Sequence, residues 1–167
     1  AKILGTYKPL VVIDCFAGKG RFDDGSTGSP IIIANHIRSV LESDKENKNI
    51  RGLFIESKYA KELETNLRGY KNCEVLPGTF EENIYKILAL NSHCNLFLYV
   101  DPYGIKCLDF QQFELIKAKN FSSLEMLLNF NSFAFLREGC RLLNLNYESL
   151  FSDDQSEDEY EWDEANT

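Results

Sequence analysis

Five short apolar segments, of three to seven residues each, are the feature that most constrains the fold of this chain. They comprise residues 10–16, 52–56, 74–76, 95–101 and 124–130. These segments are continuously apolar and mostly bounded by polar, glycine or proline residues. That pattern is typical of strands covered on both faces of a parallel sheet.

Helical patterns separate these predicted strands. Ser29-Pro30 is a start signal, because serine can cap a helix and proline fits its first turn. The predicted helices cover residues 31–41, 58–68, 80–90, 109–118 and 131–145. Strand–helix alternation repeated five times predicts an α/β, doubly wound, mainly parallel sheet of the Rossmann-like type.

The net charge of −8 is confined to one end of the chain. Eight of the 26 acidic residues lie in residues 152–167, which contain no basic residue, so the 18 basic residues balance the acidic ones in residues 1–151. We therefore expect a neutral, Rossmann-like domain at 1–151 and an acidic tail at 152–167. Such a tail is either a solvated end or, with Tyr160 and Trp162 among its acids, a docking element.

Composition excludes several classes of protein. No apolar run approaches the roughly 20 residues of a membrane span, so we expect no membrane association. The five scattered cysteines form no C-x-x-C pair, which predicts a reducing, cytoplasmic setting and no metal site. The two isolated histidines, His36 and His93, offer little for metal or triad chemistry.

The first candidate site follows the first predicted strand, at Asp14-Cys15-Phe16-Ala17-Gly18-Lys19-Gly20. Two glycines after a strand let the backbone turn sharply and approach a ligand. The alternative is an ordinary glycine turn. A nicotinamide-dependent oxidoreductase is disfavoured, because residues 21–29 separate the glycines from the helix that a pyrophosphate needs at once.

The ends of the second and third predicted strands add two more candidates. Glu56 can accept hydrogen bonds from ribose hydroxyls, or it is an exposed strand-end carboxylate. Gly78, Thr79 and Phe80 can lie beside an adenine ring, or they are a loop glycine and a core aromatic residue.

The fourth candidate is Asp101-Pro102-Tyr103-Gly104, at the end of the fourth predicted strand. A carboxylate there can accept a hydrogen bond from an exocyclic amine, an aromatic ring can stack on a planar base, and proline keeps the turn rigid. The alternative is a plain strand-to-loop turn.

In combination, these stretches resemble the class I S-adenosylmethionine-dependent methyltransferase fold and, more narrowly, the three-Cys-motif partner family, TcmP. The resembling residues occur in family order in 12–22, 28–30, 53–56, 100–105 and 127–131. The combination of D-x-F-A-G-x-G-R, G-S-P and D-P-Y-G is fairly specific, whereas each piece alone is weak.

The resemblance implies S-adenosylmethionine as cofactor, with Asp14, Gly18 and Gly20 at its methionine end and Glu56 on its ribose. It also implies that Gly78, Thr79 and Phe80 lie near the adenine. Asp101, Pro102 and Tyr103 would occupy the position where amino-methyltransferases hold a target amine. The implied function is methylation of an amino group of a nucleobase or nucleotide, so nucleic acid or a nucleotide is the expected substrate.

The sequence departs from the family pattern in three places. Lys19 stands between the glycines, Thr79 stands where an acidic residue often meets the adenine amine, and the residues after 130 show no strand pair for the usual C-terminal antiparallel hairpin. The family name also implies a radical-SAM-like partner with a three-cysteine motif. The alternative function is therefore a non-catalytic partner of that protein, with a degenerate methyltransferase fold.

Overall fold

The computed structural model describes residues 8–43, 49–104, 110–129 and 132–146 of the chain. It divides into two compact units, residues 1–130 and residues 131–167. The predicted domain boundary after residue 151 falls within the second unit. That boundary and the acidic tail at 152–167 lie outside the described residues.

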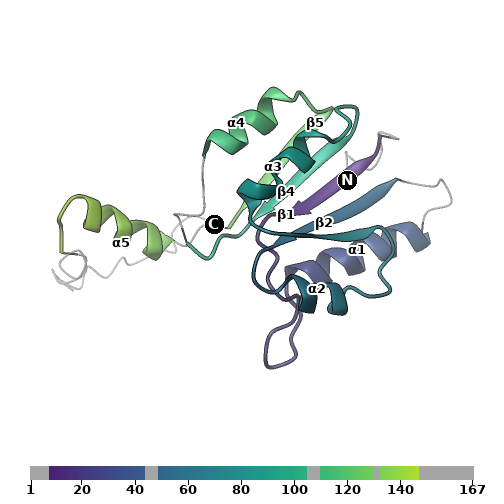
Figure 1. Ribbon diagram of the computed structural model, residues 1–167, viewed down its shortest axis with the longest axis horizontal. Coiled ribbons are helices and arrows are strands. Elements are labelled where there is room, and N and C mark those ends of the chain that lie inside the picture. The colour runs from purple at the N-terminus through teal and green to yellow at the C-terminus, as the bar shows by residue number, and fades with distance from the viewer. Residues whose placement is uncertain (1–7, 44–48, 105–109, 130–131, 147–167) are drawn as a thin grey trace, which may run out of the picture. The chain divides into compact units, whose positions relative to one another are not determined.

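The first unit is built on a parallel five-stranded sheet (Figure 1). Its strands are β1 (Leu10–Asp14), β2 (Ile50–Glu56), β3 (Cys73–Pro77), β4 (Asn95–Val100) and β5 (Ser123–Leu128). The strand order β3-β2-β1-β4-β5 reverses direction between β1 and β4. The predicted α/β, doubly wound, Rossmann-like fold is thereby confirmed.

Helices cover both faces of this sheet (Figure 1). They are α1 (Ser29–Ser43), α2 (Ala60–Asn66), α3 (Phe80–Leu88) and α4 (Phe110–Ala118). The connections through α1 and α2 run one way along the sheet and those through α3 and α4 run the other. Right-handed crossovers therefore place the two pairs on opposite faces. Among the described residues, no helix is long and apolar enough to cross a membrane.

Each face of the sheet has its own apolar core. Ile87 of α3 and Ile116 of α4 are buried against one face. Ile31 of α1 and Leu63 of α2 are buried against the other. Each fully buried side chain of this size contributes about 1.5–3 kcal/mol relative to exposure, so the four helices are held by tertiary packing.

The edge strand β5 differs from the sequence expectation. A strand covered on both faces was predicted, yet Leu124, Met126, Leu127 and Leu128 are 37–54% exposed. Among the described residues of the first unit, β5 pairs with β4 alone, and α4 covers it incompletely. An apolar groove of about 360 Å³ remains between α4 and β5.

In the second unit, the described residues form one helix, α5 (Ser132–Leu142). Arg141 donates from Nε and Nη2 to the two carboxylate oxygens of Glu138, at 2.9 and 2.6 Å. The helix ends where Asn144 takes a positive φ of 53° and the Leu145 amide donates to the Cys140 carbonyl at 2.8 Å. The predicted helix over 131–145 is thus present with a shorter C-terminus.

Candidate functional site

The carboxyl ends of β1, β2, β3 and β4 surround a cleft of about 790 Å³. This cleft lies where the strand order reverses, the usual ligand position in open α/β sheets. Eight of the ten residues predicted from the sequence line it: Gly18, Glu56, Gly78, Thr79, Phe80, Asp101, Pro102 and Tyr103. The other two, Asp14 and Gly20, do not belong to the lining.

Gly18 turns the chain at the end of β1 and faces the cleft. Its φ of +65° lies in the left-handed region, which glycine adopts without the strain that a side chain brings. In this conformation its amide donates a 2.7 Å hydrogen bond to Glu56 Oε2. Gly20, by contrast, has a φ of +82°, and a Cβ there would lie 3.0 Å from Leu63 Cδ1.

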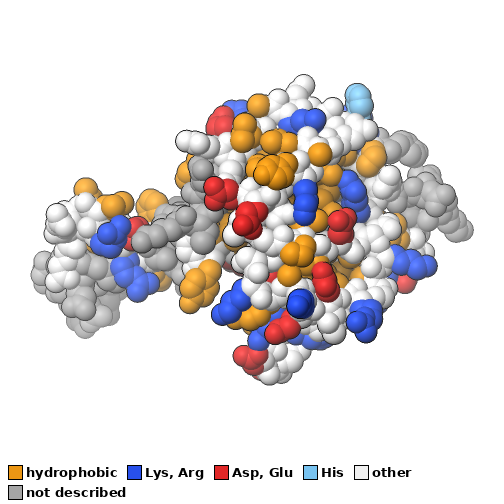
Figure 2. Space-filling view, viewed as in Figure 1, with side chains coloured by type: hydrophobic (Ala, Val, Ile, Leu, Met, Phe, Trp, Pro, Cys, Tyr) orange, Lys and Arg blue, Asp and Glu red, His pale blue; other side chains and the backbone are white. Residues whose placement is uncertain are grey.

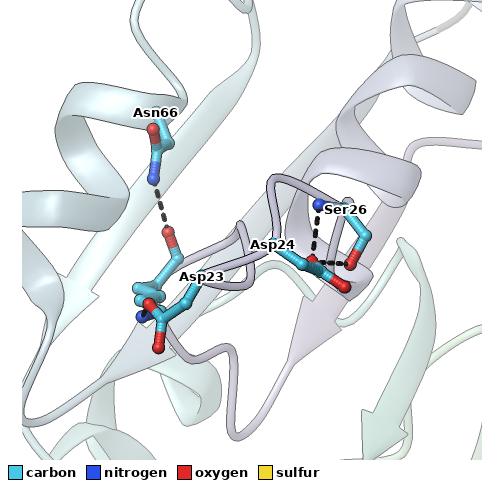
Figure 3. Close-up of polar contacts among 5 residues, drawn as sticks. Asp23, Asp24, Ser26 and Asn66 are labelled. Carbon is cyan, nitrogen blue, oxygen red and sulfur yellow. Dashed lines mark hydrogen bonds and ion pairs between the residues drawn. The ribbon is translucent and has the colours of Figure 1, made fainter.

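Residues 21–27, the first part of the excursion that separates these glycines from α1, form a small turn of their own. Arg21 and Thr27 pair as an antiparallel bridge. Asp24 Oδ1 accepts hydrogen bonds from the amide and the hydroxyl of Ser26, at 2.9 and 2.6 Å (Figure 3). The turn is exposed and adds no side chain to the cleft lining.

The backbone just before this turn is attached to α2. Asn66 Nδ2 of that helix donates to the Lys19 carbonyl at 2.7 Å (Figure 3). The side chain of Lys19 forms an ion pair with Asp23. Lys19, the departure from the family pattern, therefore holds the loop rather than reaching into the cleft.

Asp14 lies behind the cleft, fully buried at the end of β1. Its Oδ2 accepts a 2.7 Å hydrogen bond from the Ser29 hydroxyl, and its Oδ1 accepts from the Phe16 amide at 3.3 Å. Ser29, predicted as a helix cap, thus joins the start of α1 to β1. Burial raises the pKa of Asp14 to about 6, and the charges of Asp101 and Glu56 add to that rise.

Glu56 is 9% exposed at the end of β2 and accepts three backbone hydrogen bonds. Besides the Gly18 amide on Oε2, Oε1 accepts from the amides of Lys58 and Tyr59 at 2.7 and 2.9 Å. The carboxylate therefore organises two loops while still bordering the cleft. This excludes the alternative of a freely exposed strand-end carboxylate.

Gly78 and Thr79 form the tight entry to α3. Gly78 has a φ of +112°, and a Cβ there would lie 2.6 Å from Glu82 Oε2. Thr79 Oγ1 accepts the Glu82 amide at 3.2 Å, and Glu82 Oε2 accepts the Thr79 amide at 2.8 Å, which is a reciprocal capping box. The acceptor capacity of this loop is thus used largely by the helix itself.

Aromatic rings form one wall of the cleft. Phe80, 2% exposed, has its ring centroid 6.1 Å from that of Phe16 and 5.5 Å from that of Phe113. Phe80 is therefore a core residue that also borders the cleft, and its contact with an adenine ring stays a prediction.

The end of β4 adds Asp101, Pro102 and Tyr103 to the cleft lining. Asp101 Oδ2 accepts a 3.1 Å hydrogen bond from the Tyr99 hydroxyl. Burial, and then the charge of Asp101, raise the pKa of Tyr99, so this hydroxyl remains a donor. Pro102 is partly buried, whereas Tyr103 is fully exposed at the rim.

Eight lining residues were not among the ten predicted from the sequence. Seven of them lie within three positions of a predicted residue, and that adjacency was the signal for them: Cys15, Phe16, Ile55, Ser57, Lys58, Tyr59 and Glu81. Gln112 lies on α4, in a pair of glutamines that carries no motif. Its position could be learned only from the packing of α4.

The arrangement suits a ligand with both polar and flat parts. Gly18 and Glu56, from the ends of β1 and β2, line the same cleft as the aromatic residues Phe16 and Phe80. Outside it, the visible face of the first unit mixes basic and acidic side chains (Figure 2). Within the described ranges, no three His, Cys, Asp or Glu side chains are grouped as metal ligands.

Comparisons with known proteins add little to this geometry. Neither a family model nor a curated protein matches the sequence. A solved structure described as a conserved hypothetical protein of Streptococcus pyogenes aligns over 78% of each chain, with 18% identity and a TM-score of 0.44. At that TM-score, the match supports no particular function.

Proposed function

We propose that this chain binds S-adenosylmethionine in the cleft and is a methyltransferase-like protein of the three-Cys-motif partner type. Its target would be an amino group of a nucleobase or nucleotide. The observation that carries the proposal is the meeting of Gly18, Glu56 and Asp101 at one cleft, beside an aromatic wall. These residues come from three strand ends that are far apart in the sequence.

The charge at the strand ends favours a cationic ligand. The charges of Asp101 and Glu56 both raise the pKa of Asp14, so each of these two carboxylates repels that of Asp14. A ligand with positive charge relieves that repulsion. S-adenosylmethionine carries an ammonium and a sulfonium group and fits this requirement.

Glu56 retains the capacity to bind a sugar hydroxyl. An ionised carboxylate offers about four lone-pair positions, and the amides of Gly18, Lys58 and Tyr59 occupy three of them. A ribose hydroxyl would use the fourth. The same three amides hold the carboxylate in place before the ligand arrives, which reduces the ordering that binding requires.

The chemistry of the proposed transfer is mainly alignment. When bound, S-adenosylmethionine supplies a methyl group on a sulfonium that leaves readily. Asp101 would accept a hydrogen bond from the target amine, with its carboxylate oriented by the Tyr99 hydroxyl. The exposed ring of Tyr103 would stack on the base at the rim, and Pro102 would limit the movement of this turn.

Titration calorimetry with S-adenosylhomocysteine tests the binding proposal. We expect binding to the wild-type chain and at least about tenfold weaker binding to Glu56→Ala, since hydrogen bonds to a charged group contribute about 1.5–3 kcal/mol. Glu74→Ala is the matched control, because Glu74 is exposed on β3 and does not line the cleft. Absence of binding to the wild-type chain would overturn the proposal.

A second candidate is a non-catalytic partner of a radical-SAM-like three-Cys-motif protein. The exposed apolar side chains of β5 favour it, because contiguous exposed apolar surface marks interaction sites. Pull-down with a three-cysteine-motif protein, comparing the wild-type chain with Leu127→Glu, tests this candidate. Capture that Leu127→Glu abolishes, together with no binding of S-adenosylhomocysteine, would favour it over the enzyme.

A further inference from the structure

Gln112 of α4 is a buried polar residue whose side-chain oxygen has no partner. The residue is 5% exposed and lines the cleft. Among the described residues, no donor reaches its Oε1. A buried acceptor without a hydrogen bond destabilises a fold, and leucine or methionine would fill the same space without that penalty. We therefore expect a ligand to supply the hydrogen-bond donor that Gln112 Oε1 lacks.

The surroundings of Gln112 limit what that ligand can be. Gln112 precedes Phe113 in α4, and the Phe113 ring packs 5.5 Å from the ring of Phe80, another lining residue. The ring centroid of Phe16 also lies close to that of Phe80, at 6.1 Å. A group that enters here meets aromatic surface and one free acceptor. A nucleobase with an exocyclic amine has this combination of a flat apolar face and an N–H donor.

Several other side-chain acceptors around the cleft have partners within the fold. Thr79 Oγ1 accepts the Glu82 amide, and Glu82 Oε2 accepts the Thr79 amide. Glu56 accepts three backbone amides, and Asp101 accepts the Tyr99 hydroxyl. Gln112 differs from them because its oxygen loses no hydrogen bond when it turns toward a ligand.

We propose that Gln112 accepts a hydrogen bond from the exocyclic amine of the cofactor's adenine. A side chain of α4 would then recognise the base. This inference rests on the proposed function and adds a specificity-determining residue to it. Turning Oε1 toward the cleft requires rotation of the terminal amide, whose torsion is broad. The cleft would then prefer a 6-aminopurine to the same ligand without the amine.

Calorimetry on the full chain with two ligands tests this inference. The ligands are S-adenosylhomocysteine and its analogue with an unsubstituted purine in place of adenine. We expect the wild-type chain to bind the analogue about tenfold more weakly, the effect of one hydrogen bond to an otherwise unpaired buried group. Gln112→Met should bind S-adenosylhomocysteine about tenfold more weakly than wild type and bind the analogue unchanged.

Gln111→Met is the matched control, because Gln111 has the same chemistry, is exposed and does not line the cleft. It should leave both affinities unchanged. Thermal unfolding without ligand should show Gln112→Met at least as stable as wild type, because the substitution removes an unpaired acceptor. If the role of Gln112 were purely structural, Gln112→Met would instead lower the stability of the protein and leave the ratio of the two ligand affinities unchanged.

The outcomes separate this inference from the proposed function. If the wild-type chain binds neither ligand, the proposed function fails and this inference fails with it. If the wild-type chain binds both ligands equally, or if Gln112→Met keeps the wild-type preference for the amine, the role of Gln112 is refuted while cofactor binding stands. The comparison of ligands on the wild-type chain applies even if the variant does not fold.

Discussion

The amide of Gly18 donates a 2.7 Å hydrogen bond to Glu56 Oε2, which joins the loop after β1 to the end of β2. The two residues are 38 positions apart, and no local rule connects them. Their bond depends on the parallel pairing of β1 with β2, which brings both strand ends to one edge of the sheet.

Replacement of Glu56 by glutamine should lower the free energy of unfolding. Glutamine has nearly the same shape as glutamate but only one side-chain oxygen. Its NH₂ group would therefore face a backbone amide that donates to a carboxylate oxygen in the wild-type chain. We expect a loss of about 1.5–3 kcal/mol, typical of hydrogen bonds to a charged group, measured by urea unfolding. Glu74→Gln is the control, and equal stability of the two variants would contradict the prediction.

Gly78→Ala should destabilise the first unit more than Gly69→Ala does. Both glycines have positive φ, +112° and +93°, so both substitutions bring backbone strain. At Gly78 the new Cβ would also meet Glu82 Oε2 at 2.6 Å, whereas at Gly69 nothing lies within 4 Å. We expect a difference of about 1 kcal/mol from the disrupted capping box, read from urea unfolding of both variants. Equal losses would mean that the contact with Glu82 relaxes freely.

Ionisation of Asp14 should destabilise the fold as the pH rises. Its pKa is raised from 3.8 to about 6 in the folded state, so the folded chain holds this proton more tightly than the unfolded chain. The stability that the protonated carboxyl provides is full below pH 3.8 and is lost as the pH rises through 6. The loss amounts to about 3 kcal/mol at 1.36 kcal/mol per pKa unit.

Asp14→Asn isolates this effect, because asparagine cannot ionise. Relative to wild type, its unfolding free energy should rise by up to about 3 kcal/mol between pH 4 and pH 7. Asp24→Asn is the comparison. The Ser26 hydroxyl and amide lower the pKa of Asp24, so ionisation of Asp24 should stabilise the fold, the opposite of the effect at Asp14. Parallel pH profiles for wild type and Asp14→Asn would show that Asp14 keeps its ordinary pKa.

Tyr103→Ala should separate stability from substrate binding. The side chain is fully exposed, so unfolding should change by less than about 0.5 kcal/mol. If Tyr103 stacks on a target base, nucleotide affinity should fall by about tenfold, since such stacking contributes about 1–3 kcal/mol. Tyr103→Phe should retain it, and Tyr85→Ala on α3 is the exposed control. Unchanged nucleotide affinity in Tyr103→Ala would remove the stacking role.

Much of the candidate site was predictable because it follows strand ends. In a parallel sheet the carboxyl ends of neighbouring strands meet at one edge, so Gly18, Glu56, Thr79 and Asp101 had to converge once their strands were assigned. The same reasoning could not tell which side chain faces the cleft. Asp14 was predicted there, but the hydroxyl of Ser29 and the amide of Phe16 hold it in the core.

The sequence alone determined the order of strands and helices and the parallel, doubly wound sheet, because periodicity and glycine or proline punctuation are local properties. Tertiary structure decided what depends on contacts between distant segments. Packing of α4 brought Gln112 to the cleft. In the described part of the chain β5 pairs with β4 alone, and its Met126 and Leu127 are exposed. The eight acidic residues that distinguish the composition lie in 152–167, outside the described residues, and their role as a solvated end or a docking element stays a prediction.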